Sequence, residues 1–171
     1  MRPLKVLVCT TIVAATVAAG PATRAAAAQE AIYIVRHAER LDDSRDSVLS
    51  AAGRARAARL AEMLRNAGIT AVFATEYQRT IDTARPTASR LGLEVQSIAA
   101  NDTPGLLTKV RAAGPKARVL IVGHSDTAPR ILSALGYATE VVIATGEFDN
   151  LFLVIPRDKA GAAPMVVRLR Y

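Results

Sequence analysis

The sequence predicts an α/β fold, a three-layer sandwich with a mostly parallel central sheet and helices on both faces. Short segments rich in β-branched residues alternate along the chain with longer segments of helical period. Strands that alternate with helices favour a parallel sheet that is covered on both faces. In addition, the segments 31–35 and 119–122 are almost entirely apolar, as is typical of strands buried on both sides.

Six segments predict strands, because each is short and rich in apolar or β-branched residues. In chain order they are 31–35, 69–74, 93–98, 119–122, 151–155 and 165–169. The third alternates apolar and polar residues, which indicates a position near the edge of the sheet. The type of a further β-branched run at 141–144 stays open.

Four segments predict helices. They span about 50–66, 79–91, 106–113 and a stretch just after the fourth strand. Ser50 is the expected cap of the first helix, and Pro86 is expected to interrupt the second near its middle. Gly114 ends the third helix, and Ser125 or Asp126 caps the fourth.

The first 28 residues have the layout of a secretory signal peptide. Two basic residues, Arg2 and Lys5, precede an uncharged run over 6–20, and small residues at 25–28 fit a cleavage site at their end. The uncharged run is shorter than the roughly 20 apolar residues that a spanning helix needs, which disfavours the alternative of an uncleaved anchor. We therefore expect an exported protein, periplasmic or secreted.

The remaining residues, 29–171, are enough for one domain with a single core. The only cysteine, Cys9, lies within the expected signal peptide, so no disulfide is expected. The formal net charge of +7 falls to +4 without residues 1–28, which is compatible with anionic small molecules or an anionic membrane surface. No basic run is interleaved with aromatic residues, so nucleic acid is not the expected partner.

The only two histidines follow the ends of two predicted buried strands. His37 comes directly after Arg36, His124 ends the fourth strand, and Arg79 comes shortly after a third strand end. Ligands of open α/β sheets bind outside the carboxyl ends of the strands, so these side chains should converge. On a regular strand Arg36 and His37 would point to opposite faces, so the chain must leave extended geometry there.

This set of side chains matches the needs of phosphoryl transfer. Planar guanidinium groups can clamp the phosphate oxygens, and an imidazole with a free lone pair can attack the phosphorus in line with the leaving group. Neighbouring arginines disfavour protonation of a histidine and so keep its lone pair available.

Four motifs here resemble those of the histidine phosphatase superfamily, also called the phosphoglycerate mutase-like family. VRHAER resembles the family's RHG signature, and three further segments resemble its other motifs in the same order: LSAAGRARAARLAEML, FATEYQRTIDTARPTA and VLIVGHSDTAPRIL. The resemblance implies that His37 becomes the phosphohistidine, that Arg36 and Arg79 clamp the phosphate, and that His124 contacts and stabilises the phosphoryl group. Neither a metal nor an organic cofactor is implied.

The sequence offers two candidates for the acid that donates a proton to the leaving group. In many relatives an acid lies in the loop before the second-histidine strand, and Asp102 is the only acid in the matching loop, 99–105. Asp102 is therefore the predicted catalytic acid, with a turn residue as its alternative role. In the acid phosphatase and phytase branch the acid follows the second histidine, where this chain has Ser125 and then Asp126. Asp126 is the second candidate, with helix capping as its alternative role.

The sequence thus predicts an exported phosphoric monoester hydrolase that acts through a phosphohistidine intermediate. A short chain leaves no room for a long lid, and an open site suits a large or surface-tethered substrate. The expected partner is a phosphorylated small molecule or an envelope glycan. The alternatives are a protein phosphohistidine phosphatase and a domain that binds phosphate without catalysis. The natural substrate and the oligomeric state stay open.

Overall fold

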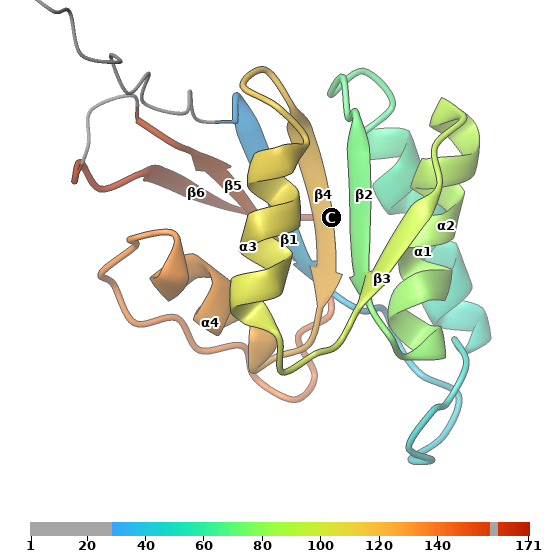
Figure 1. Ribbon diagram of the computed structural model, residues 1–171. Helices are drawn as coiled ribbons and strands as arrows, with labels where there is room; N and C mark the ends of the chain where they lie inside the picture. Colours follow the sequence, from blue (N-terminus) through green and yellow to red (C-terminus); the bar gives the residue numbers. More distant parts are fainter. Residues whose placement is uncertain (1–28, 158–160) are drawn as a thin grey trace, which may run out of the picture.

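The computed structural model describes residues 29–157 and 161–171 and contains a six-stranded sheet of order β3-β2-β4-β1-β5-β6 (Figure 1). The strands are β1 (Ala31–Arg36), β2 (Ala71–Thr75), β3 (Val95–Ile98), β4 (Arg118–Gly123), β5 (Asn150–Ile155) and β6 (Met165–Arg170). The four strands from β3 to β1 run parallel, whereas β5 is antiparallel to both of its neighbours. All six predicted strands are confirmed, with β3 at the edge.

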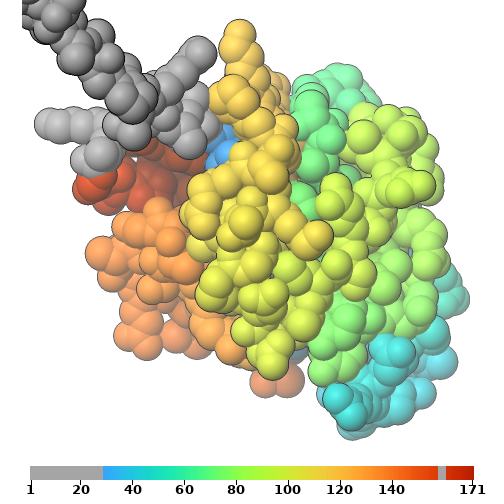
Figure 2. Space-filling model, in the orientation of Figure 1, coloured from blue at the N-terminus to red at the C-terminus, as the bar shows by residue number. Residues whose placement is uncertain are grey.

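Helices cover both faces of the sheet, which confirms the three layers. The helices are α1 (Ala51–Met63), α2 (Gln78–Leu91), α3 (Thr103–Ala112) and α4 (Thr127–Ala134). Leu60 of α1 and Ala84 of α2 share one buried cluster with Val122 of β4. On the other face, residues of α3 and α4 pack on β2 and β4, and in the space-filling view α3 lies in yellow near the centre of this face with α4 in orange beside it (Figure 2).

Two helix predictions are corrected. α2 runs unbroken from Gln78 to Leu91 with Pro86 inside it, so the predicted interruption is wrong. Proline removes one backbone hydrogen bond but has a φ compatible with a helix, and packing on the sheet outweighs that loss. α3 begins at Thr103 rather than at 106, because the Asp102 carboxylate accepts a hydrogen bond from the Gly105 N–H at 2.8 Å and caps it.

Two other predictions concern less regular segments. The run at 141–144 belongs to an irregular connection between α4 and β5, neither helix nor strand. The predicted signal peptide lies outside the described residues and stays a prediction. Among the residues that the structure does describe, no helix has both the length and the apolar character needed to cross a bilayer.

Close packing holds the segment that follows β1 against α1 and α2. The Glu39 carbonyl accepts a hydrogen bond from the Ser50 N–H at 2.9 Å, and its carboxylate binds Arg56 through contacts of 2.7 to 3.0 Å. A Cβ atom on Gly53 would lie 2.1 Å from the Glu39 carbonyl oxygen, so α1 can approach this closely only because residue 53 is a glycine. On the other side, the Ala38 N–H donates to a threonine hydroxyl of α2 at 2.9 Å.

Candidate active site

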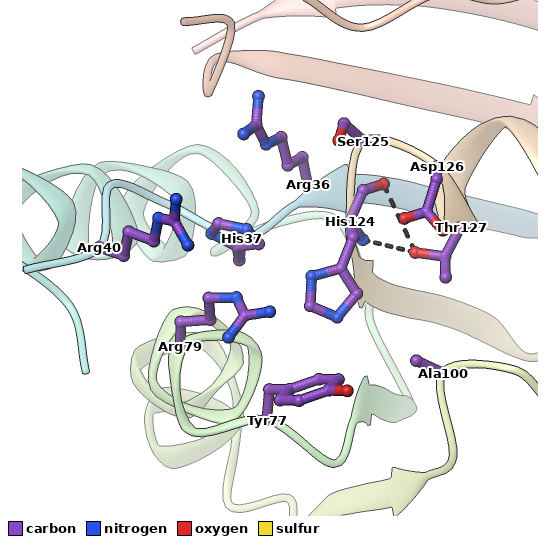
Figure 3. Close-up of a pocket in the computed structure, with 10 residues that line it drawn as sticks. All are labelled: Arg36, His37, Arg40, Tyr77, Arg79, Ala100, His124, Ser125, Asp126 and Thr127. Carbon is purple, nitrogen blue, oxygen red and sulfur yellow. Dashed lines mark hydrogen bonds between the residues drawn. The ribbon is translucent and has the colours of Figure 1, made fainter. Parts of the chain in front are cut away.

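The carboxyl ends of β1, β2 and β4 open into a cavity of about 360 Å³ (Figure 3). Its lining consists of Arg36, His37, Arg40, Tyr77, Arg79, Ala100, His124, Ser125, Asp126 and Thr127. The fold therefore brings together four residues predicted from the sequence, which are His37, His124 and the two arginines expected to clamp a phosphate. The start of α4 forms another part of the wall, and the positive end of a helix dipole favours an anion there.

His37 is 5% exposed, and its Nδ1 lies 2.7 Å from the Ala38 carbonyl oxygen. A carbonyl only accepts, so Nδ1 carries the proton and Nε2 keeps a free lone pair in the neutral ring. Burial is the main cause that lowers the pKa of His37 to about 3, while the hydrogen bond to Ala38 opposes the shift and the charges of His124, Arg79 and Arg36 add to it. At physiological pH His37 is thus a neutral imidazole with an available lone pair.

His124 lies next to His37, with ring centroids 5.2 Å apart and planes at 65°. Its Nε2 is 2.8 Å from the Thr75 hydroxyl oxygen, which lies 3.0 Å from the buried hydroxyl of Thr80. Burial lowers the pKa of His124 to about 4; the charge of Arg79 adds to this shift and that of Asp126 opposes it. Both imidazoles are therefore neutral at physiological pH.

The two predicted arginines present donors to the cavity. Arg36 Nη1 donates to three backbone carbonyls, and Arg79 Nη1 donates to the Arg45 carbonyl at 2.8 Å. In the part of the chain that the structure describes, the buried Nε of each arginine has no hydrogen-bond partner, and neither arginine forms an ion pair. Burial and then the charge of Arg40 lower the pKa of both, but guanidinium groups stay charged. Two partly desolvated cations, neither of them ion-paired within the described residues, therefore line one cavity.

Tyr77 and Ala100 line the cavity but were not among the residues predicted from the sequence. The Tyr77 ring lies 4.5 Å from the Arg79 guanidinium carbon and 5.2 Å from the His124 ring, at 83°. It therefore supports both groups from below, in the view of Figure 3. Ala100 reaches the cavity because its N–H donates to the Glu76 carboxylate at 2.7 Å. The place of Tyr77 in the sequence, two residues before Arg79, gives no sign of this role.

The two candidate acids differ in position. Asp102 does not line the cavity, because its carboxylate caps α3, and its role as proton donor stays a prediction. Asp126 does line the cavity and forms an ion pair with Arg130 at 2.6 Å, with its side chain 69% exposed. It makes no side-chain cap hydrogen bond to α4, so the expected capping role is not seen. Among the ten lining residues, Asp126 has the only carboxyl group.

The described residues, 29–157 and 161–171, contain no group of three or more His, Cys, Asp or Glu side chains that could hold a metal ion. The chemistry that the cavity offers is that of two imidazoles, the three guanidiniums of Arg36, Arg40 and Arg79, the hydroxyls of Tyr77, Ser125 and Thr127, and one carboxyl group.

Comparisons with known proteins agree with this geometry. The model of the histidine phosphatase superfamily (branch 1) matches residues 32–100, from β1 to the loop after β3. No curated protein matches the sequence significantly.

Among solved structures, the protein histidine phosphatase SixA in complex with tungstate has a TM-score of 0.66 at 18% identity, over 82% of this chain and 96% of that one. A putative phosphohistidine phosphatase SixA from Agrobacterium tumefaciens has a TM-score of 0.58 at 18% identity, over 74% and 92%. A mycobacterial glucosyl-3-phosphoglycerate phosphatase has a TM-score of 0.59 at 15% identity, over 73% and 89%. At these sequence identities, the similarity shows a shared fold.

Proposed function

Because the chain belongs to the histidine phosphatase superfamily, we propose that it is a phosphatase that hydrolyses a phosphomonoester through a phosphohistidine on His37. One observation carries the proposal: two arginines without an ion pair among the described residues, Arg36 buried and Arg79 half-buried, line the same cavity as two neutral histidines. Phosphate oxygens are the acceptors that such donors fit best. A neutral histidine beside them is the matching nucleophile.

In the first step, the Nε2 lone pair of His37 forms a bond to phosphorus while the bond from phosphorus to the leaving oxygen breaks. The hydrogen bond from Nδ1 to the Ala38 carbonyl holds the ring and stabilises the positive charge that it acquires. Arg36 and Arg79 donate to the phosphoryl oxygens, where negative charge is concentrated. The leaving oxygen takes a proton from an acid.

In the second step, water attacks the phosphorus of the phosphohistidine and the N–P bond breaks. The electron pair returns to Nε2, so the neutral ring with its Nδ1 proton is regenerated. One proton of the water returns to the acid, and inorganic phosphate leaves. Asp126 is better situated for this proton transfer than Asp102, because it lines the cavity and Asp102 caps α3.

The substrate and the compartment belong to the same proposal. The signal-peptide layout of residues 1–28 supports export to the periplasm or the medium, where the substrate would be a phosphorylated small molecule or an envelope glycan. Export predicts that the protein isolated from that compartment begins at Gln29. A mass spectrum of the exported protein that retains residues 1–28 would contradict cleavage.

The ion pair of Asp126 favours a second function. Its carboxylate is ion-paired with Arg130, and no other lining residue carries a carboxyl group. Phosphoramidates depend less on a strong proton donor than alcohol phosphates do, because their leaving nitrogen is more easily displaced. Activity as a protein phosphohistidine phosphatase is therefore the alternative, and the SixA proteins share this fold.

Purified protein tested on p-nitrophenyl phosphate, an alkyl phosphate and phosphohistidine separates these functions. The proposed phosphatase hydrolyses all three, whereas the alternative predicts a strong preference for phosphohistidine. His37→Ala should abolish hydrolysis with an unchanged melting temperature. Phosphate binding without hydrolysis of any of the three would indicate a non-catalytic phosphate-binding domain instead.

A further inference from the structure

The guanidinium of Arg36 is held on one side by the connection between α4 and β5. Its Nη1 donates to the carbonyl oxygens of Ala144, Thr145 and Glu147 at 2.8, 2.9 and 3.2 Å. The Phe148 ring lies against the guanidinium, with its centroid 4.2 Å from the central carbon and 6.0 Å from the centroid of the His37 ring. Residues 144–148 therefore determine where the remaining donors of Arg36 point.

These contacts orient the cation without neutralising it. The three acceptors are uncharged carbonyls and the fourth contact is an aromatic face, which attracts a cation through its quadrupole. A carboxylate in the same place would compete with a phosphate for the guanidinium. The one acid of this segment, Glu147, gives Arg36 its carbonyl oxygen and turns its carboxylate elsewhere.

The Glu147 carboxylate closes the turn from which those carbonyls come. One oxygen accepts the Ala144 N–H at 3.0 Å, while the Glu147 N–H donates to the Ala144 carbonyl at 3.0 Å. The carboxylate also pairs with two arginines of β6, Arg170 at 2.8 Å and Arg168 at 3.4 Å. β6 thereby fixes the turn in place, and the turn fixes the guanidinium of Arg36.

We propose that Glu147 and Phe148 are positioning residues that keep Arg36 aligned to bind the phosphoryl group, an inference that rests on the proposed phosphatase function. Neither side chain lines the cavity, so each acts through Arg36 and not on the substrate. The arrangement sets the direction of the Arg36 donors before a phosphate arrives, which lowers the entropic cost of binding.

The test is a double-mutant cycle on the full chain, with p-nitrophenyl phosphate as substrate and inorganic phosphate as competitive inhibitor. Glu147→Gln and Phe148→Leu are each made in the wild type and in Arg36→Lys, which keeps a charge but lacks the guanidinium that the turn contacts. In the wild type, we expect each substitution to weaken phosphate inhibition and raise KM roughly tenfold, with a smaller change in kcat. In Arg36→Lys, the same substitutions should change these constants less than about twofold.

Two controls separate positioning from general damage. Glu62→Gln removes a carboxylate that, like that of Glu147, pairs with two arginines, here Arg65 and Arg90, and it should leave KM and phosphate inhibition unchanged. Phe148→Tyr keeps the aromatic ring and should retain the wild-type KM and phosphate inhibition. Equal effects of the substitutions in wild type and Arg36→Lys, or no effect in wild type, would overturn the inference while leaving the phosphatase intact. A wild type that neither hydrolyses nor binds phosphate would instead overturn the proposed function.

Discussion

The hydroxyl oxygen of Thr75 lies 2.8 Å from Nε2 of His124 and 3.0 Å from the Thr80 hydroxyl. A hydroxyl carries one proton, so Thr75 either donates to Thr80 and accepts from His124, or donates to His124. In the second arrangement the proton of the neutral His124 ring is on Nδ1, which can then donate to a phosphoryl oxygen. Thr75 can thus partner either neutral tautomer of His124, because its hydroxyl can accept from Nε2 or donate to it.

We expect Thr75→Val to lower kcat/KM about tenfold or more, because a buried His124 nitrogen loses its partner. Thr75→Ser, which keeps the hydroxyl, should retain nearly full activity. The measurement is steady-state hydrolysis of p-nitrophenyl phosphate by both variants, with thermal melts to check that both fold. Equal activity of the valine and serine variants would exclude a role for this hydroxyl.

The proton donor can be identified from leaving groups. Asp126→Asn should lower kcat on an alkyl phosphate by about a hundredfold and affect phosphohistidine hydrolysis much less, because general acid catalysis matters most for a poor leaving group. Asp102→Asn is the matched control, since asparagine is also a good helix cap, and it should have little effect. A larger loss in Asp102→Asn would confirm the assignment made from the sequence, and no loss in either variant would reject both acids.

The histidines predict a decline in stability with falling pH. Each has a pKa near 6.5 when unfolded, and the folded values are about 3 for His37 and about 4 for His124. The unfolded chain therefore binds more protons between pH 6.5 and 4, so the free energy of unfolding falls as pH falls through that window.

The size of this pH dependence of stability can be checked by substitution. Each histidine contributes a slope of up to about 1.4 kcal/mol per pH unit in this window. His37→Asn should remove one such contribution, as measured by denaturant unfolding at several pH values from 4.5 to 6.5. An unchanged slope in the variant would show that His37 is protonated in the folded state as readily as in the unfolded chain.

Gly53→Ala should destabilise the protein by about 2 kcal/mol, because its Cβ would meet the Glu39 carbonyl and push α1 away from the segment after β1. Gly146→Ala makes the same chemical change where nothing lies within 4 Å, so it should change stability by less than about 0.5 kcal/mol. Thermal or denaturant melts compare the two. Similar stabilities would mean that α1 can shift without loss.

One rule of the fold allowed several residues of the site to be predicted from the sequence. Parallel strands bring their carboxyl ends to one edge, so His37, His124 and Arg79 could be expected together once their strands were recognised. Asp102 shows the limit of that rule. A loop acid can face the cavity or cap the next helix, and here the capping hydrogen bond to Gly105 competes successfully.

Other features depended on packing that no local pattern encodes. Pro86 breaks isolated helices, but its helix is stabilised by burial of Ala84 and Ala88 against the sheet. Tyr77 supports Arg79 through a contact between its ring and the guanidinium, and short-range periodicity gives no sign of it. The turn that holds Arg36 is remote from it in sequence and meets it only in the folded sheet.

The placement of β1 between β4 and β5 affects when the site assembles during folding. Ile32 of β1 pairs with Val119 on one side and Val154 on the other, so the strand that leads to His37 completes its pairing only with partners from far later in the chain. Such non-local pairings form slowly and late in folding. A chain that is still being synthesised carries His37 directly after its first strand, but β1 is flanked on both sides only after β5 has been made.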